Sequence, residues 1–446
     1  MLDKCPAERR EFIEKEESMA PETAVQKKGG FHYAFLIVAT GIVITCVPCA
    51  LVLSCAGIYF TPVSEYFGVP KASFTLYFSL LNLAMMIMLP IGGKLMSKLD
   101  NRIVLSACVV IDGLSLIAMS FFTDVWQFYV SGITLGIGTA PLIYLAVPSL
   151  INAWCKKKVG FFVGLCMAFT GIGGVIFNPV GTALIQSGPE GWRTGYLVFG
   201  IIVLVVTLPF TLFVVRTKPS DKGLQPYGAE EASADQGAQA AAPERGVSAS
   251  KAMKTAPFFA ILLFSFLITV NQTVYQFLPS YAQSFSATLP EIAALSGVIA
   301  SACMAGQAIG KIILGAVNDK SSKIGLMFGI GGGVIGVILM WFLPAQAIIL
   351  MIGSFLFGIV YACTTVQTPL LTRSVFGSRD YTNIYSRISM GGTLGGVVAA
   401  TFWGFIVDLQ GGFTIMFVLS LVCMALCFLC GMFALSQTKK MEEFSE

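Results

Sequence analysis

Three ionisable side chains, Asp112, Lys311 and Arg387, lie inside long apolar stretches of this sequence. A charged side chain at the centre of a bilayer costs at least about 2.5 kcal/mol on insertion scales, so such residues are rare and mark functional sites. Two of the three are cations, which attract a carboxylate or a similar anionic group. These residue types therefore indicate recognition of an anion, provided that the apolar stretches span a membrane.

The composition supports that condition. Of the 446 residues, 56% are hydrophobic and only 12% are charged, with a net charge of +4. A soluble domain carries about 25% charged residues. This excludes a cytosolic enzyme, a nucleic-acid-binding protein and a disordered chain. We expect an integral, multi-pass membrane protein without a cofactor or a metal site.

Apolar runs of about 20 residues, the length that crosses a bilayer, recur along the chain. Twelve such runs predict an all-α protein with two six-helix halves, and they cover roughly residues 33–60, 73–96, 103–122, 125–152, 159–186, 194–215, 257–284, 291–317, 323–343, 346–371, 382–407 and 412–435. The expected organisation is an N-terminal tail (1–32), a first half (33–215), a flexible linker rich in Ala, Gly, Ser and Glu (216–256), a second half (257–435) and a C-terminal tail (436–446). Asn178-Pro179 predicts a break in the fifth run.

Basic residues gather in the segments on one side of these runs. That side includes Lys27, Lys28, Lys98, Arg102, Lys156, Lys157, Lys158, Arg216, Lys218, Lys320, Lys323, Arg373, Arg379, Lys439 and Lys440. The opposite side has little more than Lys71 and Arg193. By the positive-inside rule the basic side is cytoplasmic, so both termini lie in the cytoplasm. We expect the protein in the plasma membrane.

The two halves carry a similar motif after their second run. Gly93 is followed by Ser97 and Lys98, with Arg102 beyond, and Gly315 is followed at the same spacing by Asp319 and Lys320. A glycine allows close helix approach, and an Asp–Lys pair can hold two helix ends together. Repeated six-helix halves of this kind are typical of transporters.

These motifs resemble the loop motif of the major facilitator superfamily, although Ser97 and Asp100 stand where that family usually has Asp and Gly. A narrower resemblance is to the monocarboxylate-transporter and oxalate:formate-antiporter group. It rests on glycine-rich fourth and fifth runs separated by Trp154 and a basic turn, with Cys155 where Phe is usual. The matching segments are Gly136–Tyr144, Lys156–Lys158, Gly171–Gly174, Gly191–Arg193, Arg216–Gly228 and Phe376–Gly411.

The resemblance implies a role for each cation. Lys311 matches a basic residue that pairs with the substrate carboxylate, and Gln307 stands one turn earlier, where monocarboxylate carriers often have an acid. Arg387 lies in a helix that supplies a basic residue in oxalate carriers. The alternatives are a Lys311 that extends to the headgroups and an Arg387 that holds the adjacent loop through Asp380.

Neutral polar residues could complete a pocket, and the candidates are Tyr144, Asn271, Tyr275 and Tyr361. For each of them, a hydrogen bond between helices is at least as good an explanation. Asp112 has no basic residue in its own run, which makes it a candidate proton carrier. The family resemblance places its helix at the periphery, which favours a hydrogen bond to a neighbouring helix instead.

We therefore expect a secondary active transporter that moves a small mono- or dicarboxylate by alternating access and works as a monomer. Coupling to a proton or to a counter-anion stays open. The alternative is a proton-driven exporter of hydrophobic or cationic compounds, which needs an acid in the central cavity. A membrane sensor would need a large soluble extension. An enzyme finds no support, because the glycine clusters lie inside apolar runs and no phosphate-binding lysine follows them.

Overall fold

The computed structural model describes residues 32–228, 246–377 and 380–443. Within these residues it has 12 helices that are long and apolar enough to cross a membrane, and it has no sheet, only two isolated bridges. The prediction of an all-α, twelve-span protein is confirmed.

Several spans of the first half consist of consecutive helical segments. Spans one to six are α2 (Ala34–Ile44), η1 (Thr45–Ser54), η2 (Ala56–Tyr59) and α3 (Phe60–Phe67); α4 (Lys71–Lys98); α5 (Asn101–Met119); α6 (Val125–Ala140), η3 (Pro141–Ala146) and α7 (Val147–Trp154); α8 (Val159–Ile185); and α9 (Gly191–Ile202), η4 (Val203–Thr207) and η5 (Phe210–Val214). A short 3₁₀ turn, η6 (Pro219–Lys222), follows span six.

The second half is more regular, and only its first span is segmented. Spans seven to twelve are α12 (Ala256–Gln272), η7 (Thr273–Phe277) and α13 (Leu278–Gln283); α15 (Ser296–Lys320); α16 (Ser322–Phe342); α17 (Ala347–Phe376); α18 (Tyr381–Asp408); and α19 (Gly412–Ser436). Short helices precede, connect or follow these spans, namely α11 (Ala249–Ala252), α14 (Pro290–Ala294) and α20 (Thr438–Glu443).

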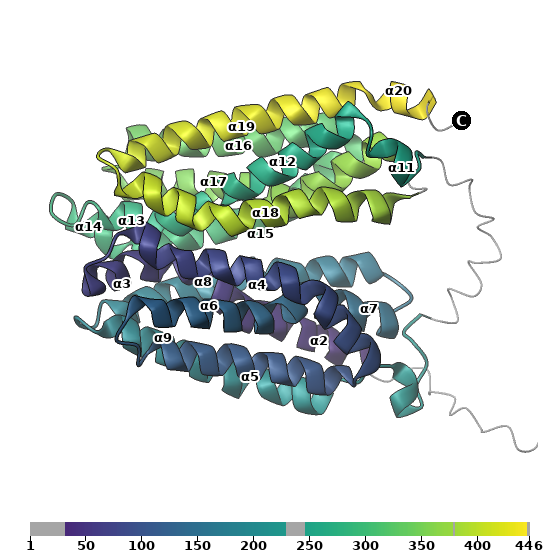
Figure 1. Cartoon of the computed structure of the whole chain (residues 1–446), viewed down its shortest axis with the longest axis horizontal. Helices are drawn as coiled ribbons and strands as arrows, with labels where there is room; N and C mark the ends of the chain where they lie inside the picture. Colours follow the sequence, from purple (N-terminus) through teal and green to yellow (C-terminus); the bar gives the residue numbers. More distant parts are fainter. Residues whose placement is uncertain (1–31, 229–245, 378–379, 444–446) are drawn as a thin grey trace, which may run out of the picture.

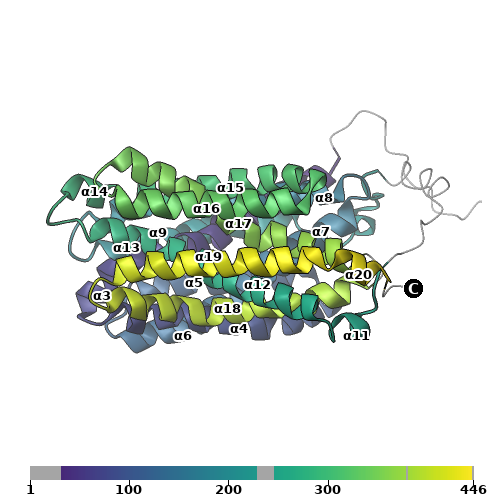
Figure 2. The same cartoon turned by 90° about the horizontal axis from the view of Figure 1, so that it is seen from above.

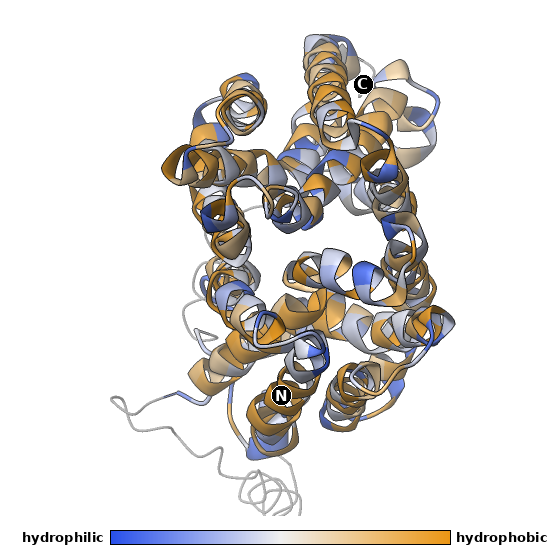
Figure 3. Ribbon diagram, turned by 90° about the vertical axis from the view of Figure 1, so that its left-hand side faces the viewer, coloured by the Kyte–Doolittle hydropathy of each residue, from blue (hydrophilic) through white to orange (hydrophobic). Residues whose placement is uncertain are grey.

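The two halves lie side by side, with the helix axes of both running along the long axis of the molecule (Figures 1 and 2). Seen end-on, the outward-facing ribbon is mostly apolar (Figure 3). Large apolar side chains such as Phe121, Phe213 and Ile312 are about 70% exposed on this surface. Water would oppose such exposure, whereas lipid favours it, so the exterior is suited to a bilayer.

Several spans change from α-helical to π-helical or 3₁₀ geometry along their length. Span one contains a π-helical segment with Pro48 inside it, and span four turns from α to π geometry at Pro141. Proline removes a backbone donor and disturbs the α-helical ladder, and π segments in helices are frequent at functional sites.

The predicted break at Asn178-Pro179 is wrong, because α8 runs without interruption from Val159 to Ile185. Pro179 cannot donate to the carbonyl of Val175, four residues earlier. Ser301 Oγ of α15 donates to that carbonyl instead (3.0 Å). A hydroxyl from the other half therefore satisfies the group that proline left without a partner, which is how membrane helices tolerate proline.

Hydrogen bonds between the halves all lie toward one end of the bundle in the part of the chain that the structure describes. We call it the sealed end; it holds the loops at residues 68–70, 284–289 and 409–411. Besides the bond from Ser301 to the Val175 carbonyl, these hydrogen bonds join Thr61 to Ser280 (2.7 Å), the Ala72 amide to Asp408 Oδ2 (2.9 Å), Ser79 to Thr401 (2.9 Å), and Tyr275 and Gln276 to the Leu53 carbonyl (2.5 and 2.7 Å). The opposite end, which we call the basic end, carries Lys98, Lys156–Lys158 and Lys320.

Both ends of the predicted linker are folded against the basic end. In the first half, Tyr227 exchanges main-chain hydrogen bonds with Trp154 and Lys156 (2.8 Å each). In the second half, the Val247 amide donates to the Phe376 carbonyl (3.0 Å), and the Ala249 amide donates to Asp380 (2.7 Å). These contacts fall at corresponding places, after span four and after span ten, so each half holds one end of the connection between them.

Candidate functional site

Three predicted tyrosines come together from spans four, seven and ten. The rings of Tyr275 and Tyr361 are stacked, with centroids 4.9 Å apart and planes at 25°. Tyr144 lies within electrostatic range of Tyr361 and of Tyr385, which both belong to the other half. Tyr144 is nevertheless 53% exposed. A side chain that faces the other half yet stays this exposed lines an opening between the halves.

Local backbone geometry positions these rings. Tyr144 lies in the π segment η3, three residues after Pro141. Tyr275 lies in η7, where span seven tightens from α to 3₁₀ geometry. Each change of helical pitch rotates the following side chains relative to a continuous α-helix, so periodicity alone does not predict where they point.

Lys311 lies on the same face of α15 as Gln307, one turn nearer the basic end. The Gln307 amide lies beside the Tyr361 hydroxyl, and its side chain is 3% exposed with no hydrogen-bond partner for Oε1 among the described residues. Lys311 is half-buried, and no described carboxylate lies within ion-pair distance of its ammonium group. A half-buried cation and a buried acceptor, both without such partners among the described residues, are the groups that a polar ligand would satisfy.

Arg387 lies away from this cluster. Its side chain is exposed, and its guanidinium contacts the Met253 sulfur, in the segment between α11 and α12. Tyr385 precedes Arg387 by two positions, so the two side chains point about 200° apart around α18. Gly391 and Gly395, four and eight residues after Arg387, pack against Leu262 and Phe266 of α12.

Asn271 also lies elsewhere. It is fully buried, and its Oδ1 accepts a hydrogen bond from the Ser420 hydroxyl of α19 (2.6 Å). This contact stays within the second half, on the face of α12 that packs against span twelve. Asn271 therefore joins α12 to α19 within the second half.

Asp112 is fully buried between α5 and span four. Its Oδ2 accepts a hydrogen bond from Thr139 (3.0 Å), and its Oδ1 has no partner among the described residues. Gly138 is in such close contact that a methyl group there would overlap Oδ1. The structure thus places Asp112 at a contact between two helices of the first half and does not bring it to the tyrosines.

The motif glycines lie at the basic end, where the halves are apart. A side chain added at Gly93 or Gly315 would meet no atom within 4 Å, so neither glycine makes a close helix contact in this conformation. Lys98 and Lys320 are exposed. The side chain of Asp319 lies outside the described residues, and with it the predicted contact of the Asp319–Lys320 pair.

In the first half, Asp100 is the acid that makes contacts. Its Oδ1 accepts from the Arg102 amide (3.0 Å) at the start of α5 and from Thr217 (3.0 Å) after span six. Asp100 stands where the family usually has a glycine. It ties the beginning of span three to the end of span six, within one half.

The residues that reasoning from the sequence missed are Tyr385 and the Leu53 carbonyl. Tyr381 and Tyr385 have parallel stacked rings one turn apart, a spacing that the sequence does display. The Leu53 carbonyl belongs to an apolar residue and leaves no signal of its own in the sequence.

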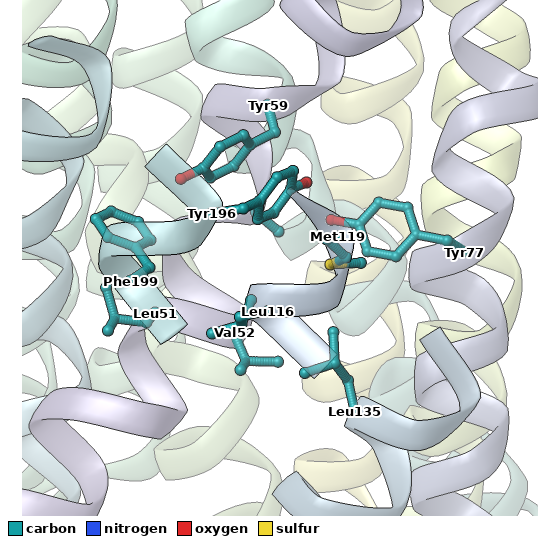
Figure 4. Close-up of a pocket in the computed structure, with 10 residues that line it drawn as sticks. Leu51, Val52, Tyr59, Tyr77, Leu116, Met119, Leu135, Tyr196 and Phe199 are labelled. Carbon is teal, nitrogen blue, oxygen red and sulfur yellow. The ribbon is translucent and has the colours of Figure 1, made fainter. Parts of the chain in front are cut away.

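A second group of buried tyrosines lies inside the first half, where Tyr59, Tyr77 and Tyr196 surround a cavity of about 10 Å³ (Figure 4). A volume of this size holds one water molecule at most. The cavity is therefore too small for an organic substrate, and the opening beside Tyr144 is the better candidate.

Comparison with known proteins identifies the family. A sequence model of the Major Facilitator Superfamily matches residues 42–303 and 293–445. The chain belongs to the major facilitator superfamily. It is an integral membrane transporter, and its function is transport rather than catalysis.

Among superfamily relatives, a probable sulfoacetate transporter of Cupriavidus necator is 22% identical over 374 residues, which cover 80% of this chain and 84% of that one. Monocarboxylate transporter 12 of Rattus norvegicus is 28% identical over 158 residues, covering 34% of this chain and 31% of that one. Monocarboxylate transporter 11 of Homo sapiens is 26% identical over 211 residues, covering 47% and 43%.

Solved structures of other transporters share the fold. A bacterial homologue of the human lysosomal transporter Spinster superposes with a TM-score of 0.71 at 13% identity, covering 93% of this chain and 99% of that one. The nucleoside transporter NupG superposes with a TM-score of 0.69 at 15% identity, covering 92% and 100%. At these identities the likeness concerns the fold alone.

Proposed function

We propose that this transporter moves a small organic anion, held by the Lys311 ammonium group beside Gln307, Tyr144, Tyr275 and Tyr361. The observation that carries the proposal is a half-buried lysine without a described carboxylate partner, next to a cluster formed by both halves. Relatives named as sulfoacetate and monocarboxylate transporters support the same class of substrate.

We infer that a single cation serves the site, because Arg387 points toward α11 and α12. One ammonium group neutralises one negative charge. A substrate with one anionic group, such as acetate or lactate, is then favoured over a dianion such as sulfoacetate, because a second buried charge would lack a partner.

Coupling by anion exchange is favoured over proton symport. Proton symport through such a lysine needs a nearby carboxylate whose protonation state controls release of the substrate. Residue 307, where monocarboxylate carriers often have an acid, is a glutamine. Asp112 accepts a hydrogen bond from Thr139 at a contact between two helices of the first half. The same placement disfavours the proton-driven exporter, which requires an acid that faces the substrate.

We also propose that the basic end faces the cytoplasm, following the positive-inside rule. With that orientation the sealed end is extracellular, and the opening beside Tyr144 faces the cytoplasm. The structure would then represent the inward-facing state of the transport cycle.

The test compares two cations in proteoliposomes loaded with unlabelled anion. Uptake of labelled acetate, lactate and sulfoacetate would be measured for the wild type, Lys311→Gln and Arg387→Gln. A hydrogen bond to a charged group contributes about 1.5–3 kcal/mol, so Lys311→Gln should weaken apparent affinity at least about tenfold. Arg387→Gln should stay within about twofold of the wild type. Equal uptake by Lys311→Gln and the wild type would refute the assignment of the site.

A further inference from the structure

Spans one and seven both change helical type where they face each other. In span one the π-helical segment ends at Ser54, Cys55 takes φ −103° and ψ 0°, and the 3₁₀ turn η2 follows. In span seven the 3₁₀ turn η7 carries Tyr275 and Gln276. Such irregular backbone leaves carbonyl groups that need partners from outside the helix.

The Leu53 carbonyl finds its partners in the other half. It accepts a hydrogen bond from the Tyr275 hydroxyl (2.5 Å) and another from Gln276 Nε2 (2.7 Å). Gln276 Nε2 is also 2.6 Å from the Tyr275 oxygen, so these groups form one connected network. Both side chains are at most 3% exposed, so bulk water does not reach these bonds.

Close backbone contact surrounds this network. A methyl group at Gly57 would overlap the Gln276 carbonyl oxygen, so the two broken segments touch main chain to main chain. One turn farther toward the sealed end, Thr61 Oγ1 donates to Ser280 Oγ (2.7 Å), and the rings of Phe60 and Phe277 lie 5.2 Å apart. Leu53, Tyr275 and Gln276 thus lie farther from the sealed end than the Thr61–Ser280 bond.

Tyr275 belongs to the seal and to the candidate site at once. Its hydroxyl reaches the Leu53 carbonyl, while its ring is stacked on Tyr361, whose hydroxyl lies beside Gln307. A ligand that draws Gln307 or Tyr361 toward Lys311 moves the surface on which the Tyr275 ring rests. The same side chain then transmits that movement to the seal.

We propose that Tyr275 and Gln276 are positioning residues that couple occupancy of the site to closure of the sealed end, through the Leu53 carbonyl. This inference rests on the proposed transport function. In the sealed state the carbonyl has two donors, and separation of the halves removes both. The free energy of these bonds biases the molecule toward the sealed state until the ligand rearranges Tyr361 and Tyr275.

The test uses a disulfide as a reporter of the seal. Thr61→Cys and Ser280→Cys are introduced together, with a protease site between Gly228 and Gly246. After oxidation and cleavage, the two halves stay joined on a gel only where the new cysteines are linked. Oxidation should block uptake, and a reductant should restore it. The linking rate then measures the sealed fraction.

Tyr275→Phe keeps the ring on Tyr361 and removes the donor to Leu53. Hydrogen bonds between membrane helices average about 0.6 kcal/mol, so the ratio of sealed to open molecules should fall about threefold. The linking rate should fall with it, by up to that factor. Tyr281→Phe is the matched control, since its hydroxyl donates to the Met340 carbonyl within the second half (2.9 Å). It should leave the rate unchanged.

Ligand dependence tests the coupling itself. Acetate, lactate or sulfoacetate should change the linking rate of the reporter with native Tyr275, and the change should vanish in Tyr275→Phe. Equal linking rates in Tyr275→Phe and Tyr281→Phe would refute the role of the Leu53 hydrogen bonds in the seal. A full ligand effect in Tyr275→Phe would refute the coupling. If no anion changes the linking rate of any variant while the rates without ligand differ as expected, the role of the Leu53 hydrogen bonds in the seal is supported. The substrate proposal and the coupling to the substrate then fail.

Discussion

At the scale of single residues, the structure separates ionisable groups that the sequence presents as equivalent. Lys311 and Arg387 are both cations within apolar runs, yet Lys311 shares a helix face with Gln307 and Arg387 contacts Met253. Asp112 is a third case, an acid that bonds to Thr139 across a helix contact. Partners, rather than charge alone, distinguish a ligand site from a structural contact.

Asp112→Asn should retain uptake within about twofold of the wild type and leave its pH dependence unchanged. Asparagine keeps an oxygen for the Thr139 hydroxyl, so the contact between α5 and span four persists. Asp112→Ala should lower the free energy of unfolding by ~1–3 kcal/mol, because the hydroxyl loses its acceptor. Thermal melting in detergent and uptake at several pH values would check both variants. Loss of the pH dependence in Asp112→Asn would instead identify a proton carrier.

At the scale of helices, glycines decide which spans approach closely. Gly306 of α15 lies against the Phe355 carbonyl of α17, and Gly358 of α17 lies against the Cys303 carbonyl of α15. The two helices therefore cross with their main chains in contact, which only residues without a side chain allow. This crossing places Gln307, which follows Gly306, beside Tyr361, which lies three residues after Gly358.

Gly306→Ala and Gly358→Ala should each destabilise the protein by ~1–3 kcal/mol, because the added methyl group overlaps a carbonyl oxygen. Gly331→Ala in α16 is the control, since a methyl group there meets no atom within 4 Å. Alanine also favours a helix by about 1 kcal/mol over glycine, so the control should be neutral or more stable. Equal melting temperatures for all three variants would contradict this view of the crossing.

At the scale of the whole molecule, one half caps a helix of the other. The Ala72 amide, in the first turn of α4, has no partner within its own helix and donates to Asp408 Oδ2 at the end of α18 (2.9 Å). A carboxylate at a helix N-terminus satisfies an open donor and interacts favourably with the helix dipole. Separation of the halves at this end removes the cap.

Asp408→Ala should weaken the seal, because a lost cap costs about 1 kcal/mol, or roughly fivefold in the equilibrium. Hydrogen exchange of the amides in the first turn of α4 should accelerate by that factor. Asp408→Asn, which keeps a side-chain oxygen, should exchange at nearly the wild-type rate. Unchanged exchange in Asp408→Ala would show that Ala72 is protected by other contacts.

The sequence by itself determined the number of spans and the split into halves, because a bilayer requires apolar helices of a set length. It also determined the family, and it identified Lys311, Gln307, Tyr144, Tyr275 and Tyr361 as candidates. Helix length and hydropathy are local properties, so they are readable without any knowledge of the neighbouring helices.

Only the tertiary structure decided which side chains meet. A membrane helix is apolar on its lipid face and on its packed face, so periodicity does not define its rotation. Packing against distant helices directs Arg387 to Met253, Asn271 to Ser420 and Ser301 to the carbonyl that Pro179 leaves open. The bonds to the Leu53 carbonyl have the same origin, because a main-chain group acquires its function from whichever residues the fold brings to it.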